Sequence, residues 1–133
     1  MTLPADVAAA LDLYPPPVRA RLLELRDLVF AVAGETDGVG PLTETLKWGE
    51  PAYLTEASGS GTTIRLGVSK QAPGAAAVFV NCRTTLIEDF RERFGDSLAF
   101  EGSRAIIVPL HGALPVEPLA FCLRAALLYH RRK

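Results

Sequence analysis

The feature that most constrains the fold is a series of short apolar segments, separated by brief turns, between residues 51 and 110. Ile64, Leu66 and Val68 alternate with small or polar residues, which is the period of a half-buried strand. The turn sequence "ASGSGT" precedes this segment, and "KQAPGA" separates it from the apolar run "AAVFVN". With "PAYLT" as the first strand, the pattern predicts a three-stranded antiparallel meander.

A further pair of strands is predicted nearer the C-terminus. The segment "SLAFEGSRAIIVPL" is typical of a hairpin, with Gly102 and Ser103 as a two-residue turn that has glycine first. Pro109 has no backbone N–H to donate, so we expect it at a strand end or at a sheet edge. The meander and the hairpin together indicate a largely antiparallel sheet.

Helices are predicted before, between and after these strand segments along the chain. The segment "YPPPVRARLLELRDLVFAVAGE" begins with prolines, and its apolar residues recur at spacings of three and four, which indicates a long amphipathic helix. In the segment "TTLIEDFRERFG", Thr85 and Glu88 have the spacing of a capping box, which predicts a shorter helix. Residues Val116–Tyr129 are apolar nearly all round, as in a buried helix or a helix at a subunit contact.

The segment "GPLTETLKWGEP" predicts a second short helix, placed before the meander. Pro41 suits its first position, and Gly49 suits its end. The residue before Pro51 is disfavoured in helical geometry, so the next strand is expected to begin at that proline. Trp48 would then lie at a helix-to-strand junction.

These elements predict one α+β domain over residues 1–133. Its largely antiparallel sheet is packed with a long N-terminal helix and a buried C-terminal helix. No segment approaches the ~20 apolar residues that cross a bilayer, and the N-terminus lacks the basic residues of a secretory signal. A cytoplasmic protein without membrane contact is therefore expected.

Charge and cysteine content exclude several classes of partner. The formal net charge is −1 with mixed signs along the chain, so no nucleic-acid partner is expected. The basic run His130–Lys133 is typical of a solvated helix end. Cys82 and Cys122 have no second ligand at metal spacing, so neither zinc nor a disulfide is predicted. No cofactor is expected, except iron under the alternative described below.

The predicted junction carries the best candidate ligand-binding residues, namely Lys47, Trp48, Glu50 and Tyr53. An ammonium group and two aromatic rings at one corner could hold an anionic or flat small molecule, with Arg65 from the following strand as a further polar contact. Alternatively, Trp48 packs in the core while Lys47 and Glu50 remain in water. The first hypothesis is a non-enzymatic small-ligand-binding or adaptor module.

The second hypothesis is an iron-binding chaperone that uses surface carboxylates. Glu88, Glu92 and Asp96 follow one another along one predicted helix, and carboxylate oxygens are ligands that iron accepts. Arg91 and Arg93 interrupt the series, which instead favours an ordinary salt-bridged helix surface. An enzyme of unknown type is a third alternative, since no pairing of nucleophile and base is evident.

The chain resembles the YdhG-like family, catalogued as domain of unknown function 1801. The resemblance covers most of residues 10 to 130, and its most specific part is the Trp-Gly-Glu-Pro sequence at 48–51. Matching segments are Tyr14-Pro15-Pro16, "ETLKWGEPAYL" (44–54), "TTIRLGVS" (62–69) and "GSRAIIVPL" (102–110). The resemblance implies a small cytoplasmic α+β domain, and frataxin-like iron chaperones among the relatives imply iron binding. The chain lacks the strongly acidic N-terminal helix that such a role would suggest.

The last predicted helix has apolar residues on two sides. Phe121, Leu128 and Tyr129 fall outside the face formed by Val116, Leu119, Leu123 and Leu127. The N-terminal helix could cover one side and a second copy the other, which would give a homodimer. The alternative is a central helix in a monomer.

Overall fold

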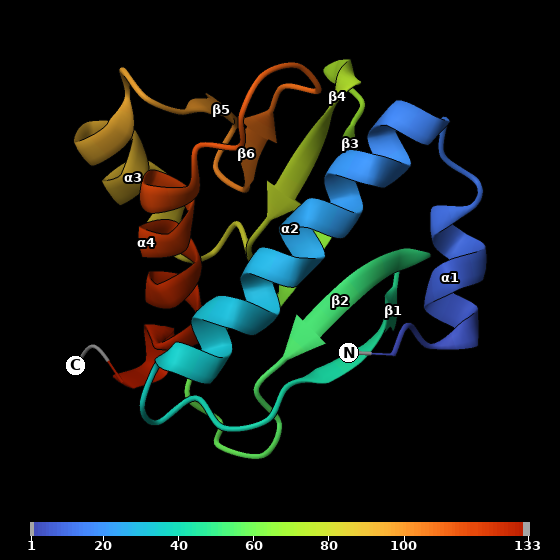
Figure 1. Ribbon diagram of the computed structural model, residues 1–133. Coiled ribbons are helices and arrows are strands. Elements are labelled where there is room, and N and C mark those ends of the chain that lie inside the picture. Colours follow the sequence, from blue (N-terminus) through green and yellow to red (C-terminus); the bar gives the residue numbers. More distant parts are fainter. Residues whose placement is uncertain (1, 132–133) are drawn as a thin grey trace.

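A six-stranded antiparallel sheet forms the centre of the computed structural model, which describes residues 2–131 (Figure 1). The spatial order of the strands is β1-β2-β3-β4-β6-β5. Every neighbouring pair is antiparallel, so the predicted α+β class and sheet type are confirmed. The strands are β1 Thr43–Lys47, β2 Glu50–Leu54, β3 Ile64–Ser69, β4 Ala72–Phe79, β5 Ala99–Glu101 and β6 Ala105–Val108.

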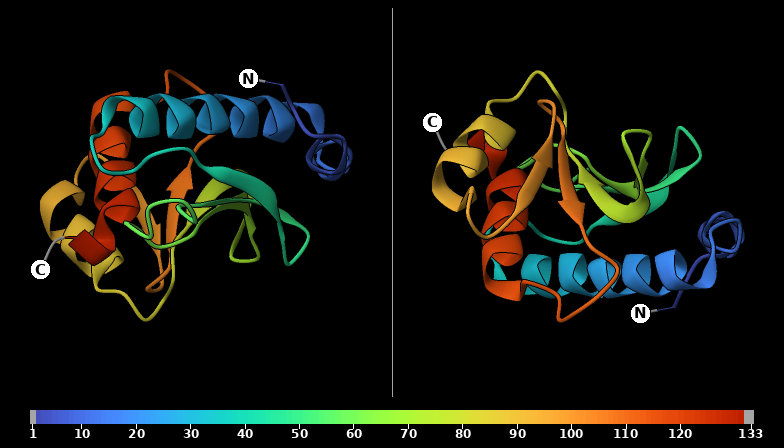
Figure 2. Two further views of the ribbon diagram at one scale, coloured as in Figure 1. Left: turned by 90° about the horizontal axis from the view of Figure 1, so that it is seen from below. Right: turned by 90° about the horizontal axis from the view of Figure 1, so that it is seen from above.

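The longer helices lie mainly on one side of the sheet. In Figure 2, α2 lies flat along the sheet and α4 crosses near the C-terminal end of α2. The helix α1 contacts β1 and β2, and α3 packs against α4 on the side away from α2. The helices are α1 Ala5–Leu11, α2 Pro16–Glu35, α3 Leu86–Phe94 and α4 Val116–Leu127, followed by a 3₁₀ turn at Tyr129–Arg131.

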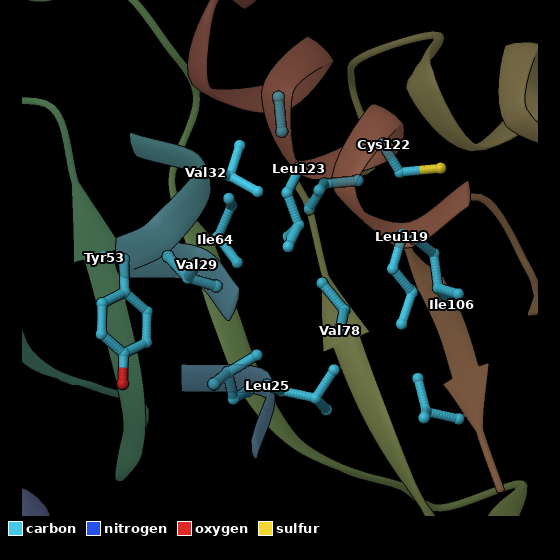
Figure 3. Packing of buried hydrophobic residues seen from close by; sticks show 14 of the residues in the cluster. Leu25, Val29, Val32, Tyr53, Ile64, Val78, Ile106, Leu119, Cys122 and Leu123 are labelled. Carbon is cyan, nitrogen blue, oxygen red and sulfur yellow. The ribbon is translucent and has the colours of Figure 1, made fainter. Parts of the chain in front are cut away.

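The core forms where α2 and α4 meet the sheet (Figure 3). The residues that the sequence pattern assigns to one face of α2 are all buried, as are inward-facing residues of β3, β4 and β6. Full burial of each such side chain contributes about 1.5–3 kcal/mol. Cys122 is part of this core, and burial raises the pKa of its thiol to about 12. Its neutral thiol is therefore an ordinary core side chain.

Two arginines of α2 are buried among these apolar residues and connect the helix to distant segments. Arg21 donates a hydrogen bond of 2.7 Å from Nη2 to the carbonyl oxygen of Gly112. Arg26 donates to both carboxylate oxygens of Glu44 in β1, at 2.5 and 2.8 Å. Because an uncompensated buried charge is costly, these bonds fix how α2 lies against β1 and the loop at 109–115.

The prediction of a short helix after Pro41 is wrong. Residues 43–47 form strand β1, which pairs with β2 so that Lys47 faces Glu50. The two residues between them, Trp48 and Gly49, have φ values of 56° and 76°, the positive values of a type I′ hairpin turn. A glycine with positive φ ends a helix and closes a hairpin equally well, so this signal does not discriminate between the two.

The loop between β2 and β3 is held against the C-terminal end of α4. The Oγ of Ser60 donates to the carbonyl of Leu127 at 2.7 Å, and the N–H of Thr62 donates to the carbonyl of Ala126 at 2.9 Å. These bonds satisfy carbonyls that have no partner within the helix. Gly61 lies so close that a Cβ there would overlap backbone atoms of Leu127.

We expect Gly61→Ala to lower the free energy of unfolding by at least about 2 kcal/mol, because the Leu127 backbone must move to admit the methyl group. Gly74→Ala is the matched control, since Gly74 lies in β4 with no neighbouring atom near its Cβ position. Urea denaturation measures both variants. Equal stability of the two would contradict the close packing of the loop on α4.

Candidate functional site

The predicted ligand-binding residues do not form one pocket, because successive strand residues point to opposite faces of the sheet. Tyr53 points toward α2, where its ring meets Phe30 edge-on at 5.6 Å between centroids (Figure 3). Glu50 and Arg65 form an ion pair on the opposite face. Lys47 and Trp48 lie at the β1–β2 hairpin turn, where both are exposed.

Trp48 is 89% exposed to solvent. The expectation that Trp48 and Tyr53 line a common wall is wrong, since Tyr53 is fully buried. The alternative of a core tryptophan is wrong as well. A tryptophan with positive φ is also strained, because its Cβ crowds the backbone in the left-handed region.

We expect Trp48→Asn to stabilise the protein by about 0.5–1 kcal/mol, since asparagine tolerates the left-handed region and suits a type I′ turn. Trp48→Phe keeps both the strain and the aromatic character, so its unfolding free energy should match that of the parent. Urea denaturation compares the three proteins. A loss of stability in Trp48→Asn would show that the indole makes a stabilising contact.

Tyr53 belongs to a buried network with Glu44 and Arg26. Its hydroxyl donates a hydrogen bond of 2.9 Å to the Oε2 of Glu44, which also accepts from Arg26. Burial raises the pKa of Tyr53 far above its usual value, and the nearby Glu44 carboxylate adds to the effect. The phenol therefore stays neutral and holds β2 against β1 and α2.

The raised pKa of Tyr53 predicts a loss of stability in alkali. Above its ordinary pKa of 10.0, the unfolded chain releases the phenol proton while the folded protein retains it. Tyr53→Phe should cost about 1–2 kcal/mol at neutral pH through the lost hydrogen bond. This difference should shrink by roughly 1.4 kcal/mol on going from pH 7 to pH 11, and about 1 kcal/mol of that loss falls between pH 10 and pH 11.

Urea denaturation at pH 7, 10 and 11 measures this difference. Tyr14, whose pKa is also raised, is present in both proteins and so cancels from the comparison. A difference that stays constant with pH would contradict the buried, neutral state of Tyr53.

Glu50 and Arg65 form a compact cluster on the sheet face opposite α2. The Glu50 carboxylate lies where a Cβ at position 67 would stand, so a larger residue at Gly67 would displace this carboxylate. Burial raises the pKa of Glu50, while Arg65 and Arg104 act in the opposite direction. The guanidinium groups of these arginines lie 5.0 and 5.7 Å from the centroid of Phe79. The cluster covers the small apolar patch on this face.

A groove of about 720 Å³ between α3 and α4 is the best candidate site. Each helix contributes side chains at spacings of four and three, so that two stripes face one another. The lining residues are Leu86, Asp89, Phe90, Glu92 and Arg93 of α3, together with Phe121, Arg124, Ala125, Leu128 and Arg131 from α4 and the turn after it. The groove thus has an apolar floor and charged edges.

Aromatic contacts join the two helices at this groove. The guanidinium of Arg93 lies 4.3 Å from the centroid of Phe121, and the rings of Phe121 and Phe94 meet edge-on at 5.3 Å. Arg131, in the turn after α4, donates a hydrogen bond of 3.3 Å to the carbonyl of Ser58. The walls are therefore held by contacts on both sides.

The sequence contained a partial signal for the groove. The N-terminal helix was expected to cover one apolar side of α4 and a second copy the other, with a central helix in a monomer as the alternative. In the structure, Phe121 and Leu128 line the groove beside α3. What the sequence did not reveal was that α3, which is distant in the chain, packs beside α4. The homodimer stays a prediction.

The carboxylates of the iron hypothesis face different surroundings. Glu92 lines the α3–α4 groove, whereas Asp96 lies beyond the end of α3 and lines a second hollow of about 300 Å³. Glu88 is exposed on α3. Within residues 2–131, no three side chains of His, Cys, Asp or Glu are grouped so that they could share a metal ion.

No family model, curated protein or solved structure matches this chain. The resemblance to the YdhG-like family therefore stays a prediction. In the part of the chain that the structure describes, no helix has both the length and the apolar composition to cross a bilayer.

Proposed function

We propose that this protein is a small-ligand-binding module whose ligand occupies the α3–α4 groove. The groove is the observation that carries the proposal, because its volume of about 720 Å³ lies within the range of small-molecule sites. The half-buried Phe121 and Leu128 supply apolar surface, and five charged residues also line the groove. Small-molecule sites commonly combine apolar walls with a few polar groups in this way.

The groove is a better site than the hairpin turn that the sequence favoured. Lys47 and Trp48 project into solvent, and the Glu50–Arg65 pair occupies the other face of the sheet. A ligand at the turn would therefore contact one ring on one side only. A ligand in the groove would instead lie between two helices and lose water from several faces, which makes binding more favourable.

Among the functions considered, the groove supports a small-molecule ligand more directly than an adaptor role or iron binding. The groove has a volume of about 720 Å³, which suits a compact molecule. A protein partner would instead need a contact surface of about 800 Å² on each side, as in standard protein interfaces. Among the described residues 2–131, no group of side chains favours iron. The proposal therefore rests on one site and one class of ligand.

The proposal predicts that Ala125→Leu blocks the groove. Ala125 lines the groove, and leucine has a helix propensity close to that of alanine, so the variant should fold normally. The probes are phenylalkyl compounds with neutral, anionic and cationic head groups, followed by NMR chemical shifts of backbone amides. Shifts should cluster on α3 and α4, and Ala125→Leu should weaken binding by about tenfold or more, equivalent to roughly 1.4 kcal/mol.

Ala113→Leu provides the matched control, because Ala113 is exposed in the loop before α4. This variant should bind the probes as the parent does. The proposal fails if none of the probes shifts the groove amides, or if Ala125→Leu binds them as tightly as Ala113→Leu.

A further inference from the structure

We propose that the groove selects ligands with a carboxylate on an apolar, ring-containing body, and that Arg124 holds the carboxylate. This inference rests on the proposed function and names the ligand class for the same site. It derives from the distribution of charge around the groove and from the partners that each charged side chain already has.

Among the arginines that line the groove, Arg124 is the one whose side chain makes no hydrogen bond, ion pair or ring contact with residues 2–131. The guanidinium of Arg93 is stacked on Phe121, and Arg131 donates to the carbonyl of Ser58. The Arg124 side chain is exposed and makes no hydrogen bond or ion pair with any residue between 2 and 131. Its planar guanidinium can therefore donate two parallel hydrogen bonds to a carboxylate without losing an existing partner.

The opposite wall gives the ligand an orientation. Asp89 and Glu92 stand on α3 beside Arg93, whereas the α4 wall contributes Arg124 and Arg131 and no carboxylate, so a negative head group is attracted to the α4 wall. The groove lining holds three arginines and two carboxylates, which leaves a net positive charge. Electrostatic complementarity of this kind favours an anion over a neutral or cationic head group on the same body.

The floor determines the body of the ligand. Phe90 and Phe121 come from opposite helices, and Leu128 extends the apolar surface toward Arg131. Phe90 is buried, whereas Phe121 is half-buried, so a ligand ring against Phe121 gains from edge-on or offset contacts in addition to the burial of its area. An aryl group joined by a short chain to a carboxylate therefore matches both the floor and the α4 wall.

Three ligands that share one body test the head-group selection: 4-phenylbutyrate, 4-phenylbutan-1-ol and 4-phenylbutylammonium. Dissociation constants are measured by NMR titration of the full chain at low and high salt. We expect 4-phenylbutyrate to bind roughly tenfold more tightly than the alcohol, as one charge-assisted pair at a partly exposed site would give. The ammonium compound should bind most weakly, and added salt should reduce the differences.

Variants of Arg124 assign the preference to this residue. Arg124→Gln should remove the advantage of the carboxylate and leave the affinity for the alcohol unchanged, and Arg124→Lys should restore part of the advantage. Arg104→Gln is the matched control, because Arg104 is exposed on the opposite face of the sheet over Phe79. It should bind all three ligands as the parent does.

The outcomes separate this inference from the proposed function. Equal affinity for the acid and the alcohol, or a preference for the ammonium compound, overturns the inference while the groove remains a binding site. Selectivity that survives in Arg124→Gln also overturns it. Failure of all three ligands to shift the groove amides overturns the proposed function and the inference together.

Discussion

The structure depends on the burial of one apolar face of α2 against β3, β4 and α4. This contact removes the largest continuous apolar surface from water, and the hydrophobic effect is roughly proportional to that area. It also requires the sheet to present alternate residues toward α2. Ile64, Val78 and Tyr53 therefore point inward, while Arg65, Phe79 and Glu50 point outward.

Polar contacts then fix how the other elements join this core. Arg26 binds Glu44 of β1, and Arg21 binds the loop before α4. The single helix α2 therefore positions both β1 and that loop. The loop around Ser60 and Gly61 fits against the end of α4. Because buried polar groups are costly when unpaired, these contacts favour one arrangement over alternatives of similar hydrophobic burial.

The groove is a consequence of how α4 divides its apolar residues between two neighbours. One face, with Leu119 and Leu123, belongs to the core. The other meets α3 only in part, with aromatic contacts around Phe121 joining the two helices. The space that remains has apolar walls and basic residues on α4, which explains why a ligand site arises there without any catalytic motif in the sequence.

Much of the sheet and of the helical order could be predicted, because strand alternation and turn residues are local signals. The hairpin at Gly102 and the long helix after the Pro15–Pro17 run are examples. The prediction failed at β1, where a glycine with positive φ suits a helix end and a hairpin turn alike. Placing the candidate site at Trp48 followed from that error, since a true helix end there would have created a corner between two elements.

The sequence by itself determined the fold class, the meander and the amphipathic face of α2, since each depends on residues that are close together in the chain. Only the tertiary structure decided which side of the sheet each strand residue occupies and which helices become neighbours. Leu86 and Leu128 lie far apart in the sequence yet line one groove. Such long-range proximity results from the packing of the whole core, and no local pattern of residues encodes it.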